Sequence, residues 1–82
     1  MAVATTTTIV DGHTYYPGDT IPDLGSLECI NVDGLKREYR GLIADFGKLP
    51  KYDDLGTGSS CIFQDTSEYA EYNATTKTWY LL

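Results

Sequence analysis

The sequence predicts a small, single-domain, mostly β protein. The chain has 82 residues, which leaves room for one hydrophobic core. Seven residues are tyrosines, and tyrosine, like threonine, favours strands. Short apolar or alternating runs are separated by Asp-Gly and Pro-Gly pairs, which favour tight turns. We therefore expect residues 1–82 to form one antiparallel sheet or meander of about six strands in three hairpins.

The first predicted hairpin pairs residues 6–10 with residues 13–16. Asp11-Gly12 lies between them, and this dipeptide readily adopts the positive φ angles that a two-residue turn requires. Residues 1–5, which precede it, are expected to be a frayed end. A turn at residues 17–19 and a loop at residues 21–25 complete this part of the chain.

The second predicted hairpin pairs residues 27–32 with residues 35–40 around Asp33-Gly34. Its second strand alternates, so that one face carries Leu35, Arg37 and Tyr39. One short helical turn is expected near residues 42–47, ending at Gly47.

The third predicted hairpin lies near the end of the sequence. Strands are expected at residues 59–66, 68–72 and 78–82, with a polar turn at residues 73–76.

The two cysteines, Cys29 and Cys61, lie in apolar strand segments and are expected to be partly or fully buried free thiols. Residues 25–30 and 58–62 resemble each other, as two copies of one hairpin would. If such copies lay side by side, a disulfide between the two cysteines would be possible, and the sequence leaves this pairing open.

Charge excludes several classes of partner. The net charge is −6, with six basic residues, and nucleic-acid binding depends on clustered Lys and Arg. An anionic membrane surface is disfavoured for the same reason, and no apolar run approaches the ~18 residues of a membrane span. The first residues lack the features of a signal peptide. We expect a protein made in the cytosol and not secreted by the standard route.

Nothing in the residue pattern predicts an enzyme. His13 is the only histidine and follows a tight turn, where side chains are usually solvated, with no nucleophile beside it. Asp53 and Asp54 are expected on the solvated surface. The three Cys and His residues are too few for a structural zinc site. We therefore assign no catalytic, cofactor-binding or metal-binding residue.

Four aromatic residues form the one candidate interaction surface: Tyr69, Tyr72, Trp79 and Tyr80. Aromatic side chains on a sheet can stack on sugars or bind proteins. The alternative is that Tyr72 and Trp79 pair across a hairpin and close the core.

A longer pattern runs through most of the chain. In the second half it comprises Leu49-Pro50, Gly58-Ser59, Cys61-Ile62, Asp65-Thr66, residues 69–72 and residues 76–80. In the first half it comprises residues 19–26, Asp33-Gly34 and residues 39–42. This pattern resembles short proteins encoded among the structural genes of phages and prophages of Gram-positive gut bacteria. The resemblance implies a protein made in the bacterial cytoplasm and incorporated in the virion. Its role would be that of a head decoration, head fibre or tail accessory protein, with other phage structural proteins as partners.

The hypothesis from the sequence is therefore a non-enzymatic structural or interaction module of a phage particle. The alternative is a carbohydrate or host-surface binding module that uses the aromatic surface. A homo-oligomer, or a monomer that needs a larger partner, is also expected, because a core of this size contributes about 3–5 kcal/mol at most. Residues 5–10 contain no charge or proline to protect a strand edge.

Overall fold

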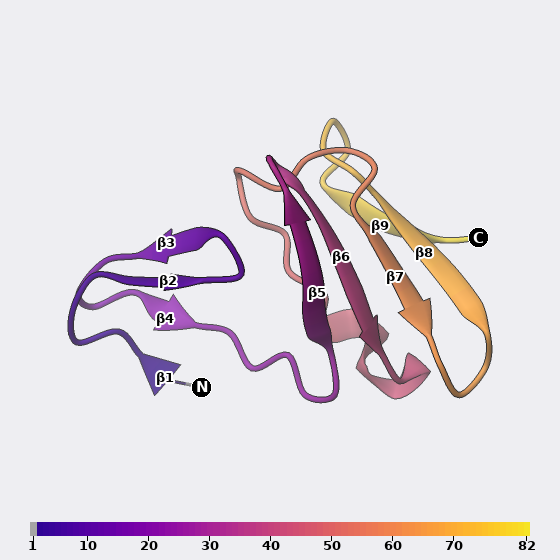
Figure 1. The fold of residues 1–82 in the computed structure, drawn as a ribbon, viewed down its shortest axis with the longest axis horizontal. Helices are drawn as coiled ribbons and strands as arrows, with labels where there is room; N and C mark the ends of the chain where they lie inside the picture. The colour runs from indigo at the N-terminus through magenta and orange to yellow at the C-terminus, as the bar shows by residue number, and fades with distance from the viewer. Residues whose placement is uncertain (1) are drawn as a thin grey trace.

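A five-stranded mixed sheet forms the larger part of the computed structural model, which describes residues 2–82 (Figure 1). Its strands lie side by side in sequence order: β5 (Glu28–Asp33), β6 (Lys36–Gly41), β7 (Ser60–Phe63), β8 (Glu68–Asn73) and β9 (Thr78–Leu81). Neighbours are antiparallel except β6 and β7, which are parallel. A parallel pair needs a long crossover, and residues 42–59 provide it, including the 3₁₀ helix η1 (Ile43–Lys48).

Two short ribbons precede this sheet and lie beside its β5 end (Figure 1). The first and last strands of this N-terminal part, β1 (Ala2–Val3) and β4 (Thr20–Ile21), pair with each other. Between them in the chain, β2 (Thr8–Val10) and β3 (His13–Tyr15) form a hairpin. The mostly β prediction is confirmed, and the β1–β4 pair is an addition to the predicted strands.

The first predicted turn is confirmed. Asp11 and Gly12 both have positive φ, 53° and 78°. Gly12 also lies so close to the sheet that an added Cβ would be 3.0 Å from Cγ1 of Val32. The prediction that residues 1–5 are frayed is wrong for Ala2–Ala4. Ala2 and Val3 pair with β4, and Ala4 is buried. The N–H of Ala4 donates to the carbonyl of Asp19, and its carbonyl accepts from the N–H of Gly18. Met1 lies outside the described residues.

The second turn is displaced by one residue from its prediction. Asp33 belongs to β5 and pairs with Lys36, so the turn residues are Gly34 and Leu35. Of these two turn residues, only Gly34 has a positive φ, which suits a turn with glycine at its first central position. The predicted alternation of β6 is confirmed for Arg37 and Tyr39, which are buried, whereas Leu35 in the turn is exposed.

The predicted helical turn near residues 42–47 is present as η1, but Gly47 lies inside it and does not end it. Asp45 anchors η1 to the start of β5. Its Oδ2 accepts hydrogen bonds from the N–H (2.9 Å) and the Oγ–H (2.6 Å) of Ser26. Its Oδ1 lies 3.2 Å from Nζ of Lys48.

The core lies on one side of the five-stranded sheet. Side chains from this face pack against η1 and the crossover: Tyr39, Cys61, Phe63, Ala70, Tyr72 and Trp79 from the strands, with Leu49 and Leu55 opposite. Tyr72 is opposite Trp79 in the β8–β9 register, and the indole N–H donates to the carbonyl of Pro50 at 2.8 Å. The sheet therefore has one covered and one uncovered face.

Cys29 and Cys61 are both free thiols, half-buried and buried respectively, as predicted. They are in β5 and β7, and each is in register with Tyr39 of β6, which lies between them. Two strand spacings separate their backbones by about 9.5 Å, which is too far for a disulfide. The two similar segments therefore begin two different hairpins of one sheet, β5–β6 and β7–β8. These hairpins meet through β6 and β7, so β6 separates the two strands that carry the cysteines.

We predict that both thiols react slowly in the native protein, and that Cys61 reacts last. Burial raises the pKa of Cys61 to about 11 and also raises that of Cys29, so neither is a thiolate at neutral pH. Titration with a chromogenic disulfide reagent, with and without denaturant, measures this. Two thiols that react at once under native conditions, or an intact mass two protons lower, would contradict it.

We also predict an acid-sensitive contribution from Asp45. The hydrogen bonds from Ser26 and the contact with Lys48 lower the pKa of Asp45 from 3.8 to about 2. As the pH falls, the Asp45 carboxylate is therefore protonated in the unfolded chain before it is protonated in the folded protein. Its stabilisation of the folded state is present above pH 3.8 and is lost as the pH falls towards 2. Urea unfolding from pH 5 to pH 2 should show a shallower loss of stability in Asp45→Asn than in the wild type. Equal slopes would exclude this contribution.

Candidate functional site

A buried guanidinium joins the N-terminal ribbons to the five-stranded sheet. Arg37 is 1% exposed. Its Nε donates to the carbonyl of Asp11 at 2.6 Å, and its Nη1 donates to the carbonyls of Asp54 (3.2 Å) and Leu35 (3.4 Å). Its Nη2 lies 3.5 Å from Oδ2 of Asp54. The charge is thus compensated by one carboxylate and three carbonyl dipoles, as a buried charge requires.

His13 bonds to the same carboxylate from the other side. Its Nδ1 lies 2.7 Å from Oδ1 of Asp54, and a carboxylate only accepts, so the proton is on Nδ1. The imidazole stacks on Tyr52 with ring centroids 4.0 Å apart. The hydroxyl of Tyr15 donates to that of Tyr52 at 2.6 Å. Strand β3 thus supplies His13 and Tyr15, and the crossover supplies Tyr52 and Asp54.

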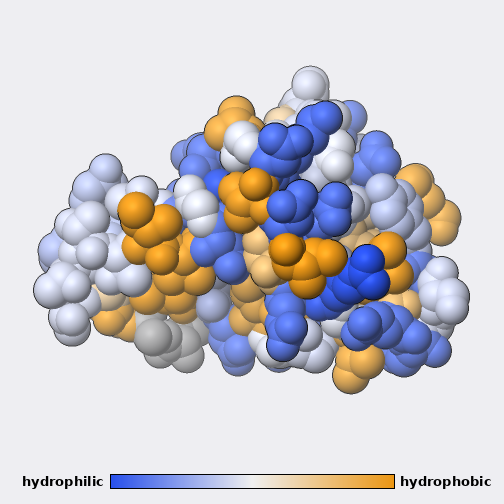
Figure 2. All heavy atoms as spheres, in the orientation of Figure 1, coloured by the Kyte–Doolittle hydropathy of each residue, from blue (hydrophilic) through white to orange (hydrophobic). Residues whose placement is uncertain are grey.

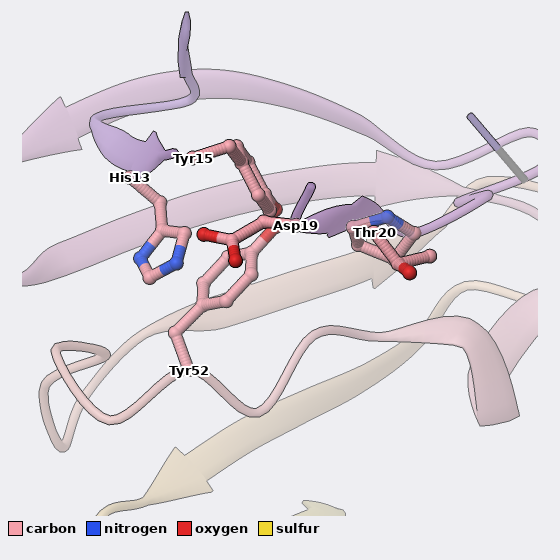
Figure 3. Close-up of a pocket in the computed structure, with 6 residues that line it drawn as sticks. His13, Tyr15, Asp19, Thr20 and Tyr52 are labelled. Carbon is pink, nitrogen blue, oxygen red and sulfur yellow. The ribbon is translucent and has the colours of Figure 1, made fainter. Parts of the chain in front are cut away.

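His13, Tyr15 and Tyr52 line an open hollow of about 400 Å³ together with Asp19, Thr20 and Pro22 (Figure 3). Asp54 is not among the residues that line it. Burial alone would raise the pKa of Asp54, but the hydrogen bond and charge of His13 and the charge of Arg37 lower it overall. Burial raises the pKa of Tyr15 and Tyr52. At neutral pH the hollow is therefore lined by the imidazole and two neutral phenols, and the ionised Asp54 carboxylate bonds to the imidazole from outside the lining.

The Asp54–His13 pair has the geometry of a base and its orienting carboxylate. Within residues 2–82, no hydroxyl or thiol is hydrogen-bonded to His13, and a phenol of raised pKa is a poor nucleophile. In the described part of the chain, no three His, Cys, Asp or Glu side chains gather where they would hold a metal ion. The contacts of the pair instead attach β3 to the crossover.

The sequence-based prediction was wrong for His13, which was expected in solvent and is half-buried against Tyr52 and Asp54. The prediction of a solvated surface is confirmed for Asp53, whose side chain is 95% exposed. It holds only in part for Asp54, whose side chain is 41% exposed and bonds to His13. The partners are 41 residues apart, and no local pattern marks such a contact.

The second candidate site is the uncovered face of the five-stranded sheet, called here the outer face. It carries hydrophobic side chains among hydrophilic ones (Figure 2). The exposed large hydrophobic side chains that the register places on it come from β7, β8 and the C-terminal end: Ile62, Tyr69, Tyr80 and, just after β9, Leu82. In the register, Arg40, Ile62 and Tyr69 form one row across β6, β7 and β8, and Glu38, Ser60, Glu71 and Tyr80 form the next.

The predicted four-residue aromatic surface is divided between the two faces. Tyr72 and Trp79 are buried in the core at 1% and 6% exposure, so the core-closing alternative is the correct one for these two. Tyr69 and Tyr80 are exposed on the outer face. The reason is the two-residue alternation of strands, which places odd and even positions on opposite faces.

Comparison with protein-family models, with curated proteins and with solved structures found no match. Among the described residues, no helix has the length and hydrophobicity needed to cross a membrane.

We predict that Asp54→Ala destabilises the protein by about 1–2 kcal/mol, because it removes hydrogen bonds to Arg37 and His13 and leaves a buried guanidinium without its carboxylate. The partial exposure of Asp54 keeps the loss below that of a fully buried pair. Asp53→Ala is the matched control and should change stability by less than about 0.5 kcal/mol, since its contact with Lys77 is a surface pair. Denaturant unfolding measures both, and equal losses would contradict the structural role of Asp54.

Proposed function

We propose that this chain is a non-enzymatic interaction protein of a phage particle, such as a head decoration, head fibre or tail accessory protein. Its outer face would contact other structural proteins of the particle. The phage setting rests on the sequence resemblance alone. The mode of action rests on the outer face, and no part of the proposal requires a catalytic group.

One observation carries the interaction role: an uncovered sheet face with exposed Ile62 on β7, Tyr69 on β8 and Tyr80 on the edge strand β9. Tyrosine is enriched in protein interfaces, and the buried centre of an interface is more apolar than the rest of the surface. Glu38 and Glu71 lie in the neighbouring row, and neither is in an ion pair within residues 2–82. A partner surface with apolar side chains beside lysine or arginine would therefore complement it.

The carbohydrate-binding alternative now rests on Tyr69 and Tyr80 only. Tyr80 is opposite Glu71 in the register, one row away from Tyr69, so the two rings are diagonal neighbours on adjacent strands. Sugar stacking needs open ring faces, and these two tyrosines, 36% and 46% exposed, are the aromatic side chains that the outer face offers for it. A glycan array distinguishes the two functions: glycan binding that Tyr69→Thr and Tyr80→Thr abolish favours the alternative.

We predict that the wild-type protein co-sediments with purified particles from an induced prophage that encodes it. The double variant Ile62→Thr/Tyr69→Thr should lose about tenfold or more of this association, because it removes central apolar contact area. Threonine retains strand propensity, so the sheet is preserved.

Val3→Thr is the matched control, because it makes the same apolar-to-threonine change at an exposed residue of β1. It should co-sediment like the wild type. Wild-type protein absent from the particles, or a gene neighbourhood without capsid, portal or tail genes, would overturn the proposed function.

A further inference from the structure

The two edges of the five-stranded sheet differ in how well they are protected against pairing with a strand of another chain. The β5 edge has a bulge between Cys29 and Asn31 and carries Glu28 and Asp33, and bulges and charges are common means of preventing strand addition. The β9 edge has none of these features. Thr78–Leu81 contains no charge and no proline, and its pairing with β8 is regular.

The direction of the main-chain groups in β9 follows from one hydrogen bond. The N–H of Leu82 donates to the carbonyl of Tyr69 in β8. Because hydrogen-bonded positions alternate in an antiparallel pair, Tyr80 and Thr78 also bond to β8. Trp79 and Leu81 therefore direct their N–H and carbonyl groups away from the sheet, and in the described structure these groups have no hydrogen-bond partner.

We propose that two copies of this chain associate through β9, antiparallel, and join their two sheets into one. With the two-fold axis at Tyr80, Trp79 of each copy is opposite Leu81 of the other. The two pairs would exchange about four main-chain hydrogen bonds. A two-fold contact of this kind uses the same strand of both copies and closes on itself. This inference deepens the proposed function by naming a partner.

The side chains at this edge are complementary to a second copy. Leu81 is on the core side of the sheet and is 45% exposed. Beside Trp79 there is a hollow of about 240 Å³, also lined by Phe46 and Leu49. Leu81 of the second copy, placed opposite Trp79, would enter this hollow. Each copy thereby covers the exposed part of the other's core.

The outer face supports the same arrangement. Tyr80, 46% exposed, would lie beside Tyr80 of the second copy, as aromatic residues at directly opposed positions commonly do. The two outer faces would become one continuous surface. Although each copy carries a charge of −6, the pairing strands themselves are uncharged. Added salt should therefore strengthen the dimer by screening the repulsion between the remaining charges.

Sedimentation velocity of the full chain, over a range of concentration and salt, tests the proposal together with amide hydrogen exchange. We expect a concentration-dependent dimer that salt favours, in which the Trp79 and Leu81 amides become protected. Leu81→Lys should weaken dimerisation about tenfold or more. Leu81→Pro should do so as well, and it removes only an outward-facing N–H, so the ladder with β8 is retained. Val3→Lys is the matched exposed control and should dimerise like the wild type.

A monomer at all concentrations, with rapid exchange at Trp79 and Leu81, would overturn the inference. So would a dimer that folded Leu81→Lys retains, or one that is lost in Ile62→Thr/Tyr69→Thr but not in Leu81→Lys. Particle co-sedimentation separates this result from the proposed function. A monomer that binds particles leaves the proposed function intact, whereas a β9 dimer that does not bind them supports the inference alone.

Discussion

The arrangement of this molecule depends on the burial of one positive charge. Moving a guanidinium out of water costs several kcal/mol unless its donors are met in the folded state. Arg37 meets this requirement with acceptors from the β2–β3 turn, the β5–β6 turn and the crossover. The acceptors in the β2–β3 turn and the crossover are 26 and 17 residues from Arg37 in the chain. The guanidinium thus joins the ribbons, the crossover and the sheet.

Two serines complete the support of β6, the strand that carries Arg37. Oγ of Ser59 accepts the N–H of Arg37 at the start of β6, and Oγ of Ser26 accepts the N–H of Leu42 just after its end. Each serine also donates, to Gly56 and to Asp45 respectively. Ser26 and Ser59 occupy equivalent places in the two similar segments. In both segments the serine Oγ accepts a main-chain N–H at one end of β6.

The sheet is covered on one side only, and this asymmetry determines where the protein can act. The crossover and η1 occupy the core face, where Trp79 and Tyr72 contribute to stability. The outer face and the β9 edge remain available for contacts. In a chain of 82 residues, contact area of this kind also adds to the limited stability that a small core provides. In the proposed dimer, the surfaces that make contacts would also add to stability.

The sequence by itself determined the local features: the mostly β composition, the Asp11-Gly12 turn, the alternation of Arg37 and Tyr39, and the burial of Cys61. Each depends on turn geometry or on the period of a strand, which involve residues close together in the chain. Only the tertiary structure decided that β6 and β7 are parallel, that Arg37 is buried, and that His13 bonds to Asp54. These contacts bring together groups far apart in the chain, and the free energy that selects them comes from desolvation and packing in the folded state. For the same reason the outer face became recognisable as a surface only once its strands were placed side by side.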